Sequence, residues 1–375
     1  MKEFLKPIIA SFINPNTKKI RPSKWVALIF FMLLTLVPIH QMATENTWLV
    51  KLILTTNIFA IFAISWDILS GYTGQENFGH HFFVGVGGFM VGLFTVALVK
   101  PGVVEGATQA ALVNVNIPGG ILILISGVLA AFFGLLIGVP CLKLSGPYLA
   151  LATISMGLIF YEFVDKILPG LHPVIKSHAT ESIRGLPSLV SSPILFYYIV
   201  LIVTIISLLV LYSYSRSNYG FVLKAIKKDE PAAKAMSINT TFYKVTVFMV
   251  SAFFAGIAGA FLAYSLGSIA GADIQTNLGI KIISMCIVGG IGTISGSFGG
   301  SYFLMILLWS MNEIARLLSD ITGIDSIVTF YKIFQDIFYF GAIVLVLLFM
   351  PHGILTSVIN KFNARYLKKK STELW

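Results

Sequence analysis

The chain has 375 residues, of which 57% are hydrophobic and only 11% are charged, and its formal net charge is +10. An average soluble domain is about half apolar and about a quarter charged. This shortage of charge argues against soluble domains, intrinsic disorder, a disulfide-rich secreted fold and a free-standing nucleic-acid binder. Because apolar runs recur along most of the chain, the composition predicts an all-α fold, a polytopic bundle of transmembrane helices.

A helix needs about 20 apolar residues to cross the hydrocarbon core of a bilayer. Candidate spans lie near 24–40, 48–70, 82–99, 118–139, 148–168, 193–214 and 245–267. The apolar stretch 280–318 is too long for one helix and is interrupted by glycines, so we expect two segments that meet near Thr293. A last span covers 329–350. The total is ten spans, or eight to ten because the piece 280–292 is short and could only re-enter the bilayer.

The basic residues predict the orientation of these spans, because cytoplasmic loops carry the excess of Lys and Arg. Segments 1–24 and 215–244 hold six each and the tail 351–375 holds five, together 17 of the 26. An even number of spans places all three on one side. We therefore expect a cytoplasmic N-terminal segment 1–24, a transmembrane domain 25–350 with a cytoplasmic loop 215–244, and a cytoplasmic tail that contacts anionic lipid headgroups. Both termini are predicted to be cytoplasmic.

The side chains that usually carry catalysis or bind metals are sparse. Cys141 and Cys286 are isolated thiols, which form neither a disulfide framework nor a metal-ligand spacing. His80 and His81 are adjacent but lack further ligands, so they predict no metal site. No phosphate-binding GxxxxGK[ST] stretch and no supported catalytic triad occurs in the sequence. We expect no cofactor and no metal in this chain, and no enzymatic activity of its own.

The basic loop 215–244 combines helical propensity with small side chains. Pro231 suits the first turn of a helix, and Glu230 lies where a negative charge favours the positive helix end. The residues that follow form a short helix with a small apolar face, of the kind that docks into a groove on another protein. A solvated basic loop is the alternative interpretation.

Two glycine-rich stretches interrupt apolar sequence, and we expect broken helices near 71–81 and 289–300. Backbone of this kind lies at membrane depth only where it is buried in protein or faces water. Glycine-interrupted segments in both halves of a transporter indicate the transport path. Asp67 lacks a basic partner nearby in sequence, so it could face that path or pair with another helix. The candidate path residues are Asp67, Gly71, Gly74, Gln75, Asn77, His80, Gly289, Gly290, Gly292 and Thr293.

Together these stretches resemble the membrane permeases of ABC importers of the branched-chain amino acid type, in particular the M-type subunit of the heteromeric permease. The first break is similar to that family's G-Y-x-G-Q-x-x-x-G-H stretch, and the second to its G-G-x-G-(T/S)-x-x-G stretch. Segments 144–153 and 349–354 also match in order. The loop resembles the family's E-A-A…G coupling segment, but Ser237 stands where the family usually has glycine. Serine is unfavourable there if the backbone needs a positive φ.

The resemblance implies a multi-pass permease subunit in the plasma or inner membrane that takes up branched-chain or similar small amino acids by alternating access. It also implies four kinds of partner: a second related permease, two ATP-binding cassette subunits that hold ATP and Mg, an extracytoplasmic solute-binding protein, and membrane lipid. No nucleic acid is expected. The coupling residues it implies are Lys228, Asp229, Glu230, Ala232, Ala233, Met236, Ser237 and Asn239.

Three alternatives stay open at this point. The first is a urea or short-amide permease of the same family. The second is an ion-coupled secondary transporter, for which Asp67 would be the only good intramembrane carboxylate. The third is a purely structural membrane subunit.

Overall fold

The computed structural model describes residues 22–44, 47–97, 118–142, 144, 146–167, 182–184, 186, 188–323, 326–350 and 353–354. Almost all of the predicted N-terminal segment 1–24 and of the basic tail 351–375 lies outside these ranges. The domain boundaries predicted there therefore stay predictions.

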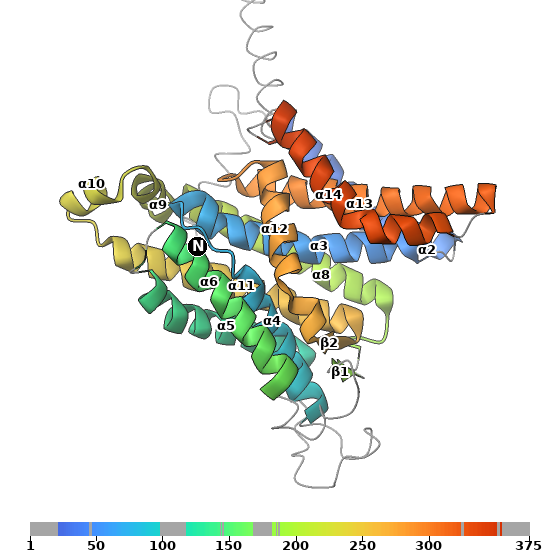
Figure 1. Ribbon diagram of the computed structural model, residues 1–375, viewed down its shortest axis with the longest axis horizontal. Coiled ribbons are helices and arrows are strands. Elements are labelled where there is room, and N and C mark those ends of the chain that lie inside the picture. The colour runs from blue at the N-terminus through green and yellow to red at the C-terminus, as the bar shows by residue number, and fades with distance from the viewer. Residues whose placement is uncertain are drawn as a thin grey trace, which may run out of the picture.

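Each apolar segment expected from the sequence is helical (Figure 1). The helices are α2 (Pro22–Thr44), α3 (Trp48–Trp66), α4 (His80–Gly92), α5 (Gly119–Cys141), α6 (Pro147–Glu162), α8 (Pro193–Arg216), α11 (Thr240–Leu266), α12 (Thr276–Gly289), α13 (Ile294–Thr322) and α14 (Ser326–Phe349). Three of them continue as π-helical turns, namely η1 (Asp67–Gly71) after α3, η2 (Leu93–Ala97) after α4 and η3 (Phe163–Ile167) after α6. The smaller elements are α9 (Asn218–Lys228), α10 (Glu230–Ala235), the 3-10 turn η4 (Gly271–Ile274), β1 (Ser182–Arg184) and β2 (Ser268–Ala270).

Six of the described helices are long and apolar enough to cross a bilayer. They are Trp48–Gly71, Gly119–Cys141, Pro147–Ile167, Pro193–Arg216, Thr240–Leu266 and Ile294–Thr322. Three shorter apolar helical stretches, Ile29–His40, His80–Thr95 and Ile333–Phe349, accompany them. This content supports the predicted all-α membrane bundle.

The centre of the bundle is α11, which packs against α5, α4 and α3. Glycines bring these helices close: a methyl group on Gly259 would overlap the carbonyl of Val84, and one on Gly134 would lie 2.8 Å from the Cβ of Ala252. Small residues at helix contacts replace the hydrophobic drive that is missing between helices in lipid. The α4–α11 and α5–α11 contacts therefore form the most closely packed part of the bundle.

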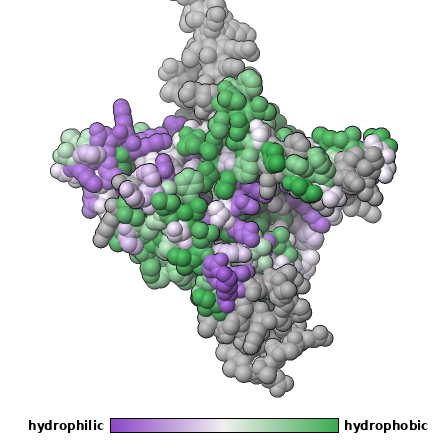
Figure 2. Space-filling view, in the orientation of Figure 1, coloured by the Kyte–Doolittle hydropathy of each residue, from purple (hydrophilic) through white to green (hydrophobic). Residues whose placement is uncertain are grey.

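The two ends of the bundle differ in chemistry. At one end, Ile183 of β1 lies opposite Ile269 of β2 in an antiparallel pair, and both side chains are buried. Figure 1 places this pair far from α10, which projects from the other end. Hydrophilic residues gather over the α9–α10 end, while hydrophobic residues cover much of the helical surface in this view (Figure 2).

Candidate coupling and translocation site

The loop between α8 and α11 forms two short helices, α9 and α10, and the second begins where Pro231 predicted the first turn of a new helix. The chain is extended at Asp229, with φ −160° and ψ 99°, and this residue separates α9 from α10. The Asp229 carboxylate accepts a hydrogen bond from the Ala232 amide at 2.9 Å, which is the expected geometry of a helix N-cap. Pro231 lies in the first turn of α10, as predicted. On α9, Leu223 and Ile226 are buried and hold the helix against the bundle.

Ser237 ends α10 in a left-handed conformation, with φ +63°. It is the one non-glycine residue with a positive φ in the described part of the chain. The Ile238 amide donates to the Ala233 carbonyl at 3.2 Å, and the Ser237 amide donates to the Lys234 carbonyl at 3.0 Å. A helix end of this kind usually has glycine at the left-handed position. The family's glycine therefore corresponds to a conformation that serine adopts here.

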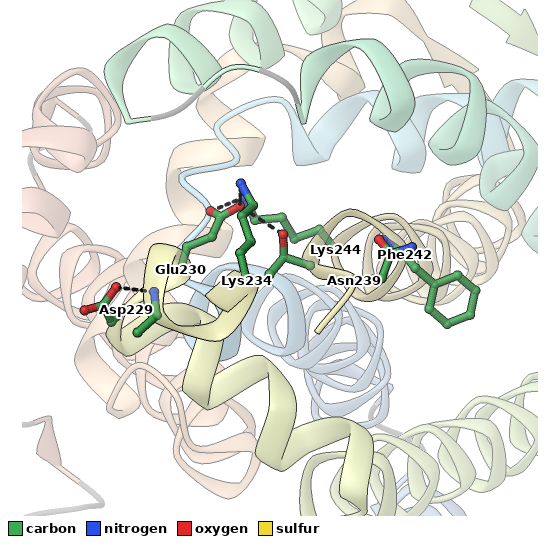
Figure 3. A network of polar contacts seen from close by, with 8 residues as sticks. Asp229, Glu230, Lys234, Asn239, Phe242 and Lys244 are labelled. Carbon is green, nitrogen blue, oxygen red and sulfur yellow. Dashed lines mark hydrogen bonds and ion pairs between the residues drawn. The ribbon is translucent and has the colours of Figure 1, made fainter. Parts of the chain in front are cut away.

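Glu230 faces the protein and does not point outward for a partner. Its carboxylate pairs with Lys244 of α11 at 2.5 Å and with Lys234 at 3.0 Å, and it accepts a hydrogen bond from the Thr240 hydroxyl at 3.2 Å (Figure 3). Burial alone would raise the pKa of Glu230, but the two lysines outweigh it and hold the pKa below its usual value. Glu230 thus ties α10 to the start of α11.

The outward surface of α10 carries apolar side chains beside the exposed Lys234. Met236 is 78% exposed, and Ala232 is exposed beside it. Lys228 is also exposed, whereas Ala233 is buried and packs inward. Asn239 acts within the chain, because its side chain accepts a hydrogen bond from the Phe242 amide at 3.1 Å and caps α11. The predicted coupling residues therefore divide into outward-facing side chains and side chains that fix the position of α10.

The first glycine-rich break folds back along α3. The helix α3–η1 ends at Gly71, yet α4 begins beside Ser65, whose hydroxyl lies 2.8 Å from the Nε2 atom of His80. Ser65 is six residues before that end, so α4 begins about 9 Å inside the bundle. Trp66 donates its indole N–H to the Asn77 carbonyl at 2.6 Å, and the Asn77 side chain accepts from the Gly79 amide at 3.0 Å. His80 is thus a hydrogen-bonded side chain of the interior.

The second break is a tight turn between α12 and α13. Gly290 and Gly292 have φ values of +116° and +79°, which only glycine adopts readily. The Thr293 hydroxyl donates to the Gly290 carbonyl at 2.7 Å. A methyl group on Gly289 would overlap the Gly296 carbonyl, so α12 and α13 approach closely here. Gly353, in the C-terminal segment that matched the family, lies against Gly290.

The two breaks meet in space. The Asp67 carboxylate, at the start of η1, accepts a hydrogen bond from the Gly292 amide at 2.7 Å, and Asp67 is fully buried. A methyl group on Gly71 would lie 2.7 Å from that same amide. Lys227 of α9 donates to the Gly71 carbonyl at 2.7 Å. Residues far apart in sequence therefore converge where the loop 215–244 reaches the bundle.

This arrangement shows where the predicted path residues lie. Half of them lie at or near Lys227, namely Asp67, Gly71, Gly74, Gly292 and Thr293. Asn77 and His80 lie deeper, beside the last turns of α3. Gln75 is 5% exposed, and neither atom of its side-chain amide has a hydrogen-bond partner within the described residues. The sequence did not predict this role of Lys227, because it shows only that the lysine belongs to a basic loop.

A cleft of about 210 Å³ opens between α4, α6 and the first turn of α12. Its lining residues are His81, Gly157, Leu158, Tyr161, Gln275, Thr276 and Asn277. His81 is 1% exposed and its Nε2 atom faces Gly157, where a methyl group would overlap the ring. Gly157 lies ten residues after the start of α6, about 15 Å along the helix. Across the described ranges, no three His, Cys, Asp or Glu side chains come together as a metal site.

The fold and the site define a class of membrane transport subunit: a helical bundle whose buried helix breaks are joined to a polar loop with a small exposed helix. Residues 48–347 match the family described as branched-chain amino acid transport system / permease component, and the chain belongs to this family. The sequence analysis predicted this assignment.

Several transport proteins align with most of the chain. It is 24% identical over 356 residues to the high-affinity branched-chain amino acid transport system permease protein LivM of Salmonella typhimurium, covering 87% of this chain and 74% of that protein. It is 25% identical to LivM of Escherichia coli K12, covering 80% and 68%, and 27% identical to LivH of the same organism, covering 79% and 91%. No solved structure matches the chain.

Proposed function

We propose that this chain is the membrane permease subunit of an ABC importer that takes up branched-chain or similar small amino acids by alternating access. Separate ATP-binding cassette subunits hydrolyse ATP, a second related permease completes the path, and an extracytoplasmic solute-binding protein delivers the solute. The complex lies in the plasma or inner membrane, and this chain has no enzymatic activity of its own. The family and the named relatives support this proposal.

The topology within this proposal has ten spans with both termini in the cytoplasm. Its support is the set of contacts at the α9–α10 end. Four residues that lie together each follow an even-numbered predicted span. They are Gly71 after the second span, Lys227 after the sixth, Gly292 after the eighth and Gly353 after the tenth. A chain that starts inside returns to the inside after every even span, so these contacts are those of one cytoplasmic face. The short helix α12 counts as the eighth span, and the breaks at 71–79 and 290–293 lie on this side.

The observation that carries the coupling role is the way α10 is held. Its outer surface exposes Ala232 and Met236, while the carboxylate of Glu230 binds Lys244 at the start of α11. A force applied by an ATPase subunit on the exposed surface therefore passes into α11, the central helix of the bundle. Small and apolar side chains on an exposed helix fit a groove on a partner protein.

The solute route in this proposal includes the cleft beside His81. The cleft opens about 15 Å along α6, and it combines the N-terminus of α12 with polar side chains of Tyr161, Gln275 and Asn277. Helix N-termini stabilise negative charge, so the site suits the carboxylate of an amino acid. A bulky side chain introduced by Gln275→Trp should block uptake while ATP binding by the complex stays normal. Unchanged uptake by this variant would remove the cleft from the route.

The test of the whole proposal is reconstitution of the complex in vesicles, with uptake of leucine and urea measured in parallel. We expect uptake of leucine that needs ATP and the ATPase subunits and that survives collapse of ion gradients. Preferential uptake of urea would instead support the alternative of a urea or short-amide permease. Uptake that persists without ATPase subunits and stops with the ion gradient would show a secondary transporter, and no flux of any solute would leave a structural subunit.

A further inference from the structure

We propose that Lys227 is a positioning residue that latches the two glycine breaks to the coupling loop, and that its release lets them separate during transport. This inference rests on the proposed importer function. Lys227 lies in the loop that resembles the family's coupling segment, but it is not one of the coupling residues that the resemblance implies.

The Lys227 side chain reaches both breaks. Its ammonium group donates to the Gly71 carbonyl at 2.7 Å, and a methyl group on Gly292 would lie 3.9 Å from the same nitrogen. Its stem packs on Gly74, where a methyl group would lie 3.2 Å from Cγ of the lysine. The carbonyl of Gly71 is freed because the regular helix ends there. The Lys227 ammonium group thus donates the hydrogen bond that a backbone amide would donate to the Gly71 carbonyl in a continuing helix.

The carboxylate of Asp67 lies at the same contact as the Lys227 ammonium group. The carboxylate is fully buried, and its hydrogen bond from the Gly292 amide joins the two breaks directly. The Lys227 ammonium group lies at the same contact through its bond to the Gly71 carbonyl, although the lysine side chain itself is exposed. A cation near a buried carboxylate favours the charged form of that carboxylate. Lys227 and Asp67 therefore hold the Gly71–Gly292 contact from its two sides.

The place of Lys227 in the chain connects this unit to α10. Lys227 lies two residues before Asp229, the N-cap of α10, so a displacement of α10 must move the end of α9. In this structure the latch is engaged and the breaks are in contact. Withdrawal of the ammonium group would free the Gly71 carbonyl and weaken the hold on Asp67. The structure is thus a closed arrangement at this end of the bundle.

A neighbouring lysine provides a matched control. Lys224 lies three residues earlier on α9, and its ammonium group lies 5.0 Å from the centre of the Tyr72 ring. Such a cation–π contact is weaker than a hydrogen bond to a charged donor. Lys224→Met removes the same charge from the same helix and touches the same break, but it leaves the Gly71 carbonyl bonded.

The experiment compares Lys227→Met, Lys227→Arg and Lys224→Met in the complete reconstituted complex, measuring both ATP hydrolysis and leucine uptake. We expect Lys227→Met to keep hydrolysing ATP while leucine transported per ATP falls about tenfold. Lys227→Arg keeps a donor and should retain more than about half of the parent ratio, and Lys224→Met should change it less than about twofold. An unchanged ratio in Lys227→Met, or equal losses in both methionine variants, would overturn the latch.

A second arm covers the case in which Lys227→Met does not assemble. The stability of Lys227→Met, Asp67→Asn and the double variant is then measured in detergent as a double-mutant cycle. If the lysine compensates the buried carboxylate, Asp67→Asn should restore assembly of Lys227→Met, and purely additive losses would refute the latch. A parent complex without ATP-driven uptake would instead refute the importer function, so the two failures can be told apart.

Discussion

The coupling helix α10 and the pair of glycine breaks hold their shapes in opposite ways. The α10 region is fixed by side chains at a water-facing end, through the Asp229 cap and the ion pairs of Glu230. The breaks are fixed by backbone groups, namely the Gly292 amide and the Gly71 carbonyl, which take one buried carboxylate and one lysine as partners.

This difference suggests that the two regions change in different ways during transport. Pairs near the surface are weak and screened by salt, so they can rearrange when a partner docks. Buried polar groups with fixed backbone partners tolerate little change, because an unpaired group in a low-dielectric interior is costly. We infer that α10 moves as a small unit, and that the breaks change between discrete arrangements. Each variant below alters one side of this comparison.

The largest effect is expected for Glu230→Lys. The new ammonium group would lie among Lys234 and Lys244, and Lys244 is only 9% exposed, so solvent cannot relieve the repulsion. ATP-driven uptake should fall more than about tenfold, because α10 loses its tie to α11. Membrane insertion, measured as the amount of protein in the membrane, should stay normal. Glu230→Gln, which keeps the size and an acceptor oxygen, is the control and should retain part of the uptake; full uptake by Glu230→Lys would argue against coupling through this residue.

Gly292→Ala tests the breaks. Gly292 has φ +79°, and a methyl group there would lie 3.1 Å from the Gly71 carbonyl oxygen. The left-handed conformation disfavours L-residues, and the free energy of unfolding should fall by about 1–3 kcal/mol. Thermal unfolding in detergent measures this loss. Gly120→Ala is the matched control, since a methyl group there meets nothing within 4 Å. Equal melting temperatures for the two variants would show that the turn at 290–293 is not constrained.

Met236→Asp tests the exposed surface of α10. Because Met236 is 78% exposed, a charge there should leave the melting temperature of the isolated permease unchanged. The amount of ATPase subunit that co-purifies should fall about fivefold, as an apolar contact in a partner groove is replaced by a charge. Met236→Leu keeps the apolar volume and should behave like the parent. Normal co-purification with Met236→Asp would place the docking surface elsewhere.

The smallest effect is expected at Ser237. Its φ of +63° is unfavourable for serine and free for glycine, so Ser237→Gly should stabilise the end of α10 by about 1 kcal/mol. Hydrogen exchange of the Ile238 amide, which bonds to the Ala233 carbonyl, should slow accordingly. Ser237→Val should accelerate it, because a β-branched side chain tolerates this conformation least. The same exchange rate in both variants would mean that the left-handed cap does not form.

The sequence predicted the local features of this fold and missed the long-range ones. Apolar runs predicted the long helices of the bundle, and the place of Pro231 predicted the start of α10, because both depend on neighbours in the chain. The two glycine-rich stretches contain the non-helical residues 74–79 and 290–293, and the breaking of membrane spans there stays a prediction. The contact of Lys227 with Gly71 spans 156 positions, and no periodicity or spacing encodes it. For the same reason Glu230, expected to face a partner, was not recognised as the residue that binds Lys244.

The loop analysis also predicted the importance of one departure from the family pattern. Ser237 was noted because glycine is usual there, and the backbone does adopt the left-handed conformation that makes glycine favourable. The two alternatives for Asp67 were less well separated by sequence alone. Its hydrogen bond to the Gly292 amide supports pairing with another segment of the bundle.

The measurement that tests the central claim most directly is cross-linking from position 236 in the assembled complex. A Met236→Cys variant, compared with the parent that carries only Cys141 and Cys286, should form a cross-link to an ATPase subunit in inside-out vesicles. The yield should change when ATP is added, because α10 moves with the ATPases in this account. The opposite result would be that a membrane-impermeant reagent labels the cysteine at position 236 from outside the cell, with no cross-link to an ATPase subunit. That result would contradict the docking of α10 on an ATPase subunit.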